Sequence, residues 1–530
     1  MKFDHSLTVQ EGDLVEYIEE TECSLYVTGR AGSGKSVQLK RYVERNNHRT
    51  LRVAPTGIAA LNSGGVTIHR AFRLPIKPIL DSPQDIADCA KRVGKEVKLA
   101  STLIIDEVGM VRADTWEVID QILRIVKKND TPFGGIRIIA FGDLYQLPPI
   151  VSESERDYFI DRYGSDRGYF FMTKVMKEIP FRVVELTRVF RQKDDRFISL
   201  LNSIRVGQVT TDQLNLLNSR YRPDFKAAEG YVTLCPRNST ADAINKARLE
   251  SLAGEPKSYI ADVDPGFPSA RPNDDVVTLK PGCQVMIVKN IKLDDGTIIP
   301  NGQIGIAKEL NRESVLVEVN GADYLVHYEE WEAHSPFVDK GKLKSRSCGC
   351  FRQIPLRVAY ASTIHKTQGV TLERCVIDME GGAFADGQTY VALSRCRSLD
   401  GIILKIKLAK SDIRADKLLA KFMAWNQANG RYVEFIQDVI EDGNQKQKPP
   451  IDIINDGARN NGWVTPQEMS AMDDMLRDGN ESECLHASRI VLPRMSDELI
   501  CLRTEVSDMK SRIGLLEEQL ASANECVAAE

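Results

Sequence analysis

Eight residues near the N-terminus, Gly29 to Ser36, match the pattern G-x-x-x-x-G-K-[ST]. An apolar run at Ser24–Thr28 precedes them and a helix-compatible run at Val37–Arg45 follows, which is the context that a phosphate-binding loop needs. Glycines let backbone N–H groups turn toward phosphate oxygens, and the helix N-terminus adds a partial positive charge. The predicted nucleotide-binding residues here are Gly29, Arg30, Ala31, Gly32, Ser33, Gly34, Lys35 and Ser36.

Within this loop, Lys35 is expected to reach the β- and γ-phosphates of ATP, and Ser36 to ligate Mg²⁺. A carboxylate on a neighbouring strand should complete the site, and the apolar run before Asp106 and Glu107 supplies it. Asp106 is expected to hold Mg²⁺, and Glu107 to orient or deprotonate the attacking water. A further strand leads to Gln146, a candidate sensor of the γ-phosphate.

Short apolar runs alternate with amphipathic segments in this part of the chain. Their spacing suits crossover connections, so the sequence predicts an α/β fold with a parallel sheet. The predicted strands are Ser24–Thr28, Thr50–Ala54, Thr102–Ile105, Ile136–Phe141 and Arg182–Leu186.

A second group of strands is predicted farther along, at Tyr231–Cys235, Gln284–Val288, Val358–Ala361, Cys375–Met379 and Ile402–Ile406. Between about 290 and 355 the pattern changes to short alternating runs between turns such as Asn320-Gly321. This region predicts a small antiparallel β insert.

Six segments together resemble motifs of superfamily 1 helicases, in the 5′→3′ group of petite-integration-frequency (Pif), phage Dda and RecD helicases. The segments are Thr56–Ala60 with Thr67–His69, Asp106–Met110, Gly142–Pro149 with Pro132–Ile136 before it, Val189–Gln192, Thr363–Leu372 and Tyr390–Arg395. Membership of Pif proper or of a phage or bacterial cousin stays open.

The resemblance implies a role for each matching position. Lys35, Asp106, Glu107 and Gln146 would act in catalysis with Arg191 and Arg395, two arginine fingers approaching the γ-phosphate from the second RecA-like domain. Gln10 would read adenine, and Gln368 with Gly369 would lie beside the nucleotide. The implied contacts to single-stranded DNA are Thr56, His69, Asn238, Thr363, His365 and Lys366.

The resemblance also implies two RecA-like P-loop NTPase domains with a small β-barrel insert. The predicted boundaries are 1–195 for the first domain, with a wedge-like insert at 73–98, then 196–290 and 356–410 for the second domain around a barrel at 291–355. A helical extension at 411–442, a linker at 443–465 and a coiled coil at 494–522 are predicted to follow.

The net charge of −5 is unevenly distributed. Residues 441–530 carry 18 acidic and 9 basic side chains, so the remaining 440 residues have a net charge of +4, which permits a basic groove for nucleic acid. The coiled coil rests on an unbroken heptad seam formed by Met495, Leu499, Leu502, Val506, Met509, Ile513, Leu516 and Leu520. It predicts a homodimer, a partner-protein contact, or a helix docked on the chain's own body.

The leading hypothesis is an ATP-dependent 5′→3′ DNA helicase that acts on single strands and duplex junctions in replication, recombination or repair. The alternatives are a single-strand-stimulated ATPase that remodels nucleoprotein without unwinding, and an assembly protein with an inactive core. No apolar stretch is long enough to span a membrane, and the N-terminus lacks the apolar core of a secretory signal. A cytoplasmic, nucleoid or nuclear location is therefore expected.

Overall fold

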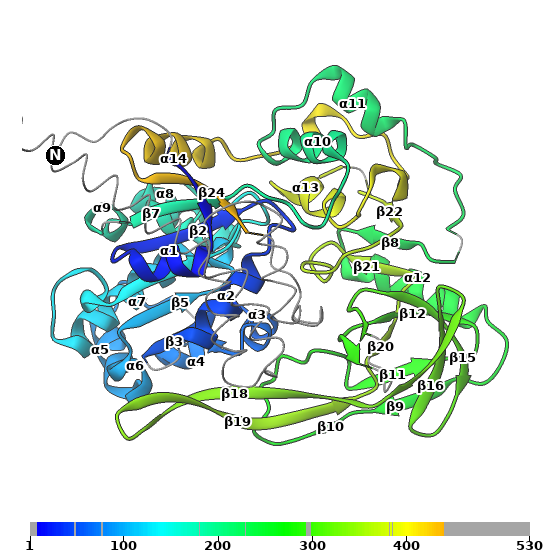
Figure 1. The fold of residues 1–530 in the computed structure, drawn as a ribbon, viewed down its shortest axis with the longest axis horizontal. Helices are drawn as coiled ribbons and strands as arrows, with labels where there is room; N and C mark the ends of the chain where they lie inside the picture. The colour runs from blue at the N-terminus through cyan, green and yellow to red at the C-terminus, as the bar shows by residue number, and fades with distance from the viewer. Residues whose placement is uncertain are drawn as a thin grey trace, which may run out of the picture. The chain divides into compact units, whose positions relative to one another are not determined.

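The computed structural model describes residues 8–46, 49–75, 78–179, 181–227, 229–292, 298–380, 382–383 and 385–438. The predicted linker at 443–465 and coiled coil at 494–522 lie outside the described residues. Three regions are built around separate sheets (Figure 1). We call them the first lobe (described residues of 8–194 and 416–438), the second lobe (195–256 and 359–415) and the insert (257–358).

The first lobe contains an eight-stranded sheet with the order β1-β24-β7-β2-β6-β5-β3-β4. Every neighbouring pair in it is parallel, which confirms the predicted parallel α/β sheet. The strands, in sheet order, are Thr8–Gly12, Tyr432–Gln437, Phe181–Leu186, Ser24–Gly29, Arg137–Phe141, Thr102–Ile105, Thr50–Ala54 and Val66–Thr67.

Helices cover both faces of this sheet, and alternate strand residues enter two different cores. In β5, Leu103 and Ile105 pack into one core while Ile104 packs into the other, as expected for side chains that alternate across a buried strand. The helices are α1 (Leu14–Glu20), α2 (Lys35–Arg45), α3 (Gly57–Asn62), α4 (Ile68–Phe72), α5 (Pro83–Arg92), α6 (Lys95–Leu99), α7 (Ala113–Lys127), α8 (Arg156–Tyr163), α9 (Val175–Glu178) and α14 (Lys417–Ala428).

The region predicted as a wedge, 73–98, consists largely of α5 and α6. Both helices contact α7, and Ile86, Val93 and Val97 are buried in the first-lobe core. The region is therefore part of the packed first lobe. Its role at a duplex junction stays a prediction.

The second lobe contains a four-stranded parallel sheet with the order β21-β8-β22-β23. Its strands are Ala361–Thr363, Val232–Cys235, Cys375–Ile377 and Ile402–Leu404, and its helices are α10 (Asp195–Arg205), α11 (Thr211–Asn218), α12 (Asn238–Glu250) and α13 (Gln388–Leu393). The single strand predicted at Val358–Ala361 is divided, because β20 ends at Val358 in the insert and β21 begins at Ala361.

The insert contains a five-stranded antiparallel sheet with the order β17-β16-β15-β12-β20, comprising Ala322–His327, Ser314–Val319, Ile304–Leu310, Cys283–Ile287 and Leu356–Val358. Short strand pairs flank it, formed by β9 (Lys257–Ile260) with β11 (Val276–Leu279) and by β13 (Ile291–Lys292) with β14 (Ile298–Ile299). The predicted boundaries were wrong here, because β12 was assigned to the second parallel domain. A five-residue apolar run does not reveal which strands it will pair with.

A long antiparallel hairpin, β18 (Glu329–Asp339) with β19 (Lys342–Gln353), extends the insert, and β10 (Asp262–Val263) pairs with β19. The hairpin contacts α3 and α6 of the first lobe. Leu343 is 4% exposed and belongs to the first-lobe core. The sequence analysis did not predict this hairpin.

The predicted helical extension at 411–442 is also corrected. It contains helix α14 and strand β24, and β24 lies between β1 and β7 in the first-lobe sheet (Figure 1). The chain therefore passes from the first lobe to the second and returns. A lone strand followed by a polar region carries little sequence signal for such a return.

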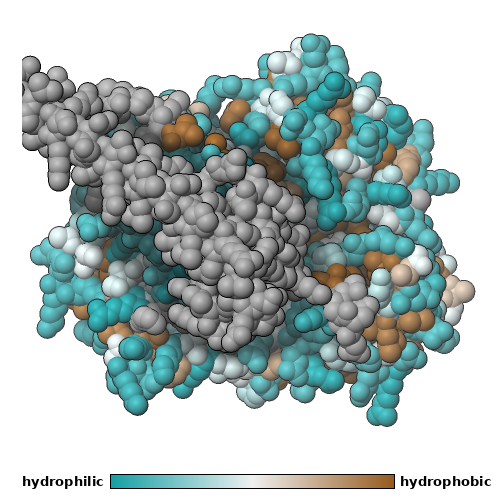
Figure 2. Space-filling view, viewed as in Figure 1, coloured by the Kyte–Doolittle hydropathy of each residue, from teal (hydrophilic) through white to brown (hydrophobic). Residues whose placement is uncertain are grey.

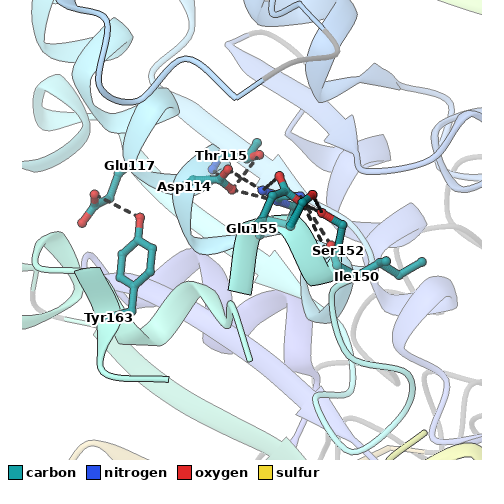
Figure 3. A network of polar contacts seen from close by, with 9 residues as sticks. Asp114, Thr115, Glu117, Ile150, Ser152, Glu155 and Tyr163 are labelled. Carbon is teal, nitrogen blue, oxygen red and sulfur yellow. Dashed lines mark hydrogen bonds and ion pairs between the residues drawn. The ribbon is translucent and has the colours of Figure 1, made fainter. Parts of the chain in front are cut away.

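A polar network connects the start of α7 to the segment after β6 (Figure 3). Arg112 Nη2 lies 2.8 Å from Asp114 Oδ2 and 2.7 Å from Glu155 Oε1, and the Ser152 amide donates to Glu155 Oε2 at 3.1 Å. Although burial opposes it, the hydrogen bond from Arg112 is the largest influence on Glu155 and lowers its pKa to about 2. The network anchors the segment around Ser152 and Glu155 to the start of α7.

The described surface in view is largely hydrophilic, with hydrophobic side chains in small groups (Figure 2). Among the helices of the described residues, none combines the length and apolar character needed to cross a membrane.

Candidate active site

The phosphate loop has the predicted strand–loop–helix geometry. Strand β2 ends at Gly29, and α2 begins at Lys35 after Gly34, which has a left-handed φ of 80°. The Lys35 ammonium donates to the carbonyls of Gly29 at 2.8 Å and Arg30 at 3.1 Å, so the side chain lies back across the loop.

Two glycines of the loop have no room for a side chain. A Cβ at Gly32, where φ is +80°, would lie 2.5 Å from the Cβ of Arg191. A Cβ at Gly29, where φ is +153°, would lie 2.8 Å from the Leu186 carbonyl oxygen. The loop is therefore held closely between β7 and the segment that contains Arg191.

The two predicted carboxylates lie at the C-terminal end of β5, the edge at which parallel sheets place ligands. Asp106 Oδ1 accepts from the Glu107 amide at 3.0 Å, and Glu107 has a left-handed φ of 51°. Burial and then the Glu107 charge raise the pKa of Asp106 to about 7, and burial raises the pKa of Glu107. A bound cation would relieve this cost of ionisation.

The donor set suits Mg²⁺. Ser36 on the first turn of α2 and Asp106 offer the hard oxygen ligands that Mg²⁺ prefers. Within the described residues, no cluster of three or more His, Cys, Asp or Glu side chains forms a metal site.

Four cationic side chains, Lys35, Arg191, Arg205 and Arg395, lie in or around the same loop. Burial, and then the charges of Arg205 and Arg191, lower the pKa of Lys35 against the opposing influence of Asp143 and Glu107. Burial lowers the pKa of Arg191, and burial with the neighbouring Arg191 charge lowers that of Arg395. Because an arginine stays charged at neutral pH, the site concentrates positive charge that an anion such as a polyphosphate would stabilise.

The two predicted arginine fingers differ in origin. Arg395 lies in the second lobe, two residues after the end of α13, and is 2% exposed. It donates from Nε to Val391 O at 2.9 Å and from Nη1 to Thr367 O at 3.3 Å. Arg191 lies in the segment that joins the lobes, so its assignment to the second domain is corrected. Its side chain nevertheless reaches the second lobe, donating from Nε to Thr371 Oγ1 at 3.0 Å and from Nη1 to Ser394 O at 3.1 Å.

Gln146 follows β6 and is half-buried. Its Nε2 lies 3.4 Å from Asp143 Oδ2. Tyr390 of α13 accepts a hydrogen bond from the Ala31 amide at 2.8 Å, so the second lobe contacts the phosphate loop directly. The structure thus gathers the predicted catalytic residues around the junction of the two lobes.

Three further predicted nucleotide contacts are less constrained. Gln10 lies in β1 opposite Phe435 of β24, and its adenine-reading role stays a prediction. Gln368 follows Thr367, whose carbonyl accepts from Arg395, so it lies one residue from that contact. Gly369 is exposed with a φ of +81°.

The predicted DNA contacts follow the C-terminal ends of parallel strands in both lobes. In the first lobe, Thr56 comes after β3 and caps α3 by accepting from the Ala59 amide at 3.2 Å, while His69 is exposed on α4. These positions face away from the fold's cores, as a nucleic-acid contact requires.

In the second lobe, Asn238 begins α12 after β8, and Thr363 ends the adjacent strand β21. His365 and Lys366 are exposed, whereas Thr363 is buried and its Oγ1 accepts from the Lys366 amide at 3.3 Å. Adjacent strands therefore bring these four residues to one edge, with Thr363 better placed to shape the loop than to touch a ligand.

Three residues of this region are not predicted by the sequence. Arg205 forms a buried ion pair with Asp143, the Tyr390 hydroxyl binds the phosphate loop, and Gln437 of β24 donates to the Ser33 carbonyl. Tyr390 lies inside a recognised motif, but nothing in the sequence alone connects Gln437 with a loop 404 residues away.

Comparisons with known proteins agree with this geometry. The family model described as PIF1-like helicase matches residues 12–215. The ATP-dependent DNA helicase PIF1 of Homo sapiens is 35% identical over 396 residues, which cover 72% of this chain and 58% of the human protein. The chain thus spans less than two thirds of the length of that curated relative.

Solved structures match more completely. Bacteroides sp Pif1 in complex with ADP-AlF4 is 35% identical with a TM-score of 0.72, covering 79% of this chain and 96% of that one. Bacteroides Pif1 bound to ssDNA is 34% identical with a TM-score of 0.55 and the same coverage. The fold, the motifs and these relatives together show that the chain belongs to the PIF1-like helicase family.

Proposed function

We propose that this chain is an ATP-dependent DNA helicase that translocates 5′→3′ on single-stranded DNA and unwinds duplex. The observation that carries the proposal is the convergence of Lys35, Glu107, Arg191 and Arg395 where the two lobes meet. Similar relatives are named ATP-dependent DNA helicases, and one was solved with ADP-AlF4 and another with ssDNA.

In this proposal each residue has a distinct task. Lys35 binds the β- and γ-phosphates, Glu107 orients and deprotonates water, and Gln146 senses the γ-phosphate. Mg²⁺, held by Ser36 and Asp106, would neutralise charge on the phosphate oxygens. Arg191 and Arg395 stabilise the phosphoryl group during its transfer. One such arginine can raise the hydrolysis rate about 10³–10⁵-fold.

Movement follows from the two-lobe construction. Arg395 belongs to the second lobe, so its attraction to the phosphates draws that lobe toward the phosphate loop, and phosphate release weakens the attraction. We propose that Thr56 and His69 hold the strand on the first lobe while Asn238, His365 and Lys366 hold it on the second. Opening and closing would then move the chain along single-stranded DNA.

Strand displacement on tailed duplexes tests the proposal. The full chain with ATP and Mg²⁺ should separate a duplex with a 5′ single-stranded tail and leave one with a 3′ tail intact. Lys35→Ala should abolish both displacement and hydrolysis, whereas Lys40→Ala, an exposed lysine on the same helix, should change neither. Stimulated hydrolysis without displacement from either tail would support the remodelling ATPase instead, and displacement from the 3′ tail would refute the polarity.

We also propose that residues 494–522 form an intermolecular parallel coiled coil. The support is the heptad seam, with predicted opposite-sign pairs Glu498–Arg503, Glu505–Lys510 and Arg512–Glu517 between strands. Light scattering should show a dimer for the full chain and a monomer for Leu502→Asp at a core position. Ser511→Asp, at an outward-facing position, should remain dimeric, and an unchanged mass for Leu502→Asp would refute the dimer.

A further inference from the structure

A buried ion cluster connects the two lobes beside the phosphate loop. Arg205, the last residue of α10, is 5% exposed and belongs to the second lobe. Its Nη2 lies 3.0 Å from Asp143 Oδ1, and its Nη1 lies 2.6 Å from Glu185 Oε1. Both carboxylates belong to the first lobe, so a single guanidinium fixes one lobe to strand β7 and to the turn after β6 of the other.

The cluster continues toward the catalytic residues through Asp143. One carboxylate oxygen, Oδ1, accepts from Arg205 and from the Tyr145 amide at 3.1 Å, while Oδ2 lies 3.4 Å from Gln146 Nε2. The Arg205 guanidinium also lies over the Tyr145 ring, 4.4 Å from its centroid. Arg205 therefore fixes the orientation of the carboxylate that Gln146 contacts.

A second contact from the second lobe holds the same turn. Gly387, which precedes α13, has a φ of +72°, and a Cβ there would lie 2.2 Å from the Gln146 carbonyl and 2.5 Å from that of Tyr145. The turn from Asp143 to Gln146 is thus enclosed by the second lobe on two sides. Its position depends on where the second lobe lies.

The chemistry of the cluster requires an arginine. Asp143 lies in the turn after β6 and Glu185 in β7. The planar fork of a guanidinium can bind both at once, whereas a lysine ammonium is a point charge. On the far side, Glu185 also accepts a hydrogen bond from the Tyr432 hydroxyl of β24. Although burial opposes it, Arg205 and Tyr432 lower the pKa of Glu185, so Glu185 binds the arginine as an anion.

We propose that Arg205 is a positioning residue that, through Asp143, presents Gln146 to the γ-phosphate in step with the second lobe. This inference rests on the proposed ATPase function. Gln146 would reach its working position only when the second lobe, through Arg205, holds the turn in place. Arg205 itself does not touch the nucleotide.

The test compares Arg205→Met and Arg205→Lys in the full chain, measuring kcat for hydrolysis with single-stranded DNA and Kd for a fluorescent ADP analogue. We expect Arg205→Met to lower kcat by about 10-fold to 100-fold, as a misplaced catalytic group does, with Kd within about twofold. Arg205→Lys should restore part of kcat, because it restores the charge without the fork. If Arg205→Met fails to fold, Arg205→Lys should still lower kcat with Kd unchanged.

Arg112→Met is the matched control, because Arg112 also pairs with two carboxylates, Asp114 and Glu155, but no described contact joins it to Gln146. It should lose thermal stability while keeping kcat. In a Gln146→Ala background, Arg205→Met should cause no further loss of kcat, since both changes remove one function.

Each other outcome is decisive. If the parent chain hydrolyses ATP and its Arg205 variants keep the parent kcat, this inference alone is overturned. The same holds if Arg205→Met lowers kcat by the same factor in the parent and in the Gln146→Ala background. A rise in Kd that accounts for the lost activity would assign Arg205 to nucleotide binding instead. A parent chain without hydrolysis would overturn the proposed function and this inference together.

Discussion

At the scale of single residues, Arg395 shows how a buried charge is kept ready for a ligand. Its guanidinium donates to Val391 O, Thr367 O and Ser394 Oγ, and these contacts orient it without neutralising it. Carbonyl and hydroxyl oxygens only partly replace water around a cation. A nearby polyphosphate would provide the missing counter-charge.

Arg395→Ala should therefore lower kcat for hydrolysis by about 10³-fold or more, because a transition-state contact is lost. Phosphate release under saturating ATP measures this effect. Arg397→Ala is the control, since Arg397 is an exposed neighbour whose ion pair with Glu373 lies at the surface. Equal losses for the two variants would contradict the role of Arg395.

Sequence alone predicts the residues whose neighbours along the chain define them. Lys35 and Asp106 follow from a loop pattern and from a strand that ends in carboxylates. Arg205 and Gln437 do not, because their partners lie 62 and 404 residues away and no local pattern links them. The missed residues are those whose role depends on tertiary contacts.

At the scale of elements, the β18–β19 hairpin links the insert to the first lobe. Leu343 near its turn is buried in the first-lobe core, although the surrounding stretch of β19 is polar and exposed. No residue of β19 between Leu343 and Phe351 is buried, so this stretch lacks the alternation by which strands are recognised. The hairpin was therefore missed, whereas the strongly apolar strands β2, β3 and β5 were predicted correctly.

Leu343→Ala should weaken this link by about 2 kcal/mol or more, because it removes buried apolar volume and leaves a cavity. Hydrogen exchange should then speed up in β18 and β19 and little elsewhere. Leu325→Ala, a 43% exposed leucine in β17, should leave exchange in the hairpin unchanged. Unchanged protection of β18 and β19 in Leu343→Ala would show that the tip contributes little to docking.

At the scale of the whole molecule, the first lobe is assembled from two distant parts of the chain. Strand β24 lies inside the sheet, with parallel partners on both sides. Its Tyr432 contacts Glu185, and its Gln437 contacts the phosphate loop. The C-terminal strand is therefore an integral part of the nucleotide-binding lobe.

Two truncations should distinguish the contribution of β24 to stability and hydrolysis from that of the residues after it. A chain ending at Asp438 should keep cooperative thermal unfolding and hydrolysis, because it retains every strand of the eight-stranded sheet. A chain ending at Gly430 lacks β24, so among the described strands β1 loses its one partner and β7 keeps only β2. Circular dichroism melting should show a large loss of stability, and an unaffected melt would contradict the structural role of β24.

The interior place of β24 also has a consequence for how the protein is made. Ribosomes synthesise a chain from its N-terminus, and domains usually fold in that order. Here the ATP-binding half stays unfinished until nearly the last described residue has emerged. Nascent molecules are therefore expected to complete the sheet that holds the phosphate loop only after β24 has been translated.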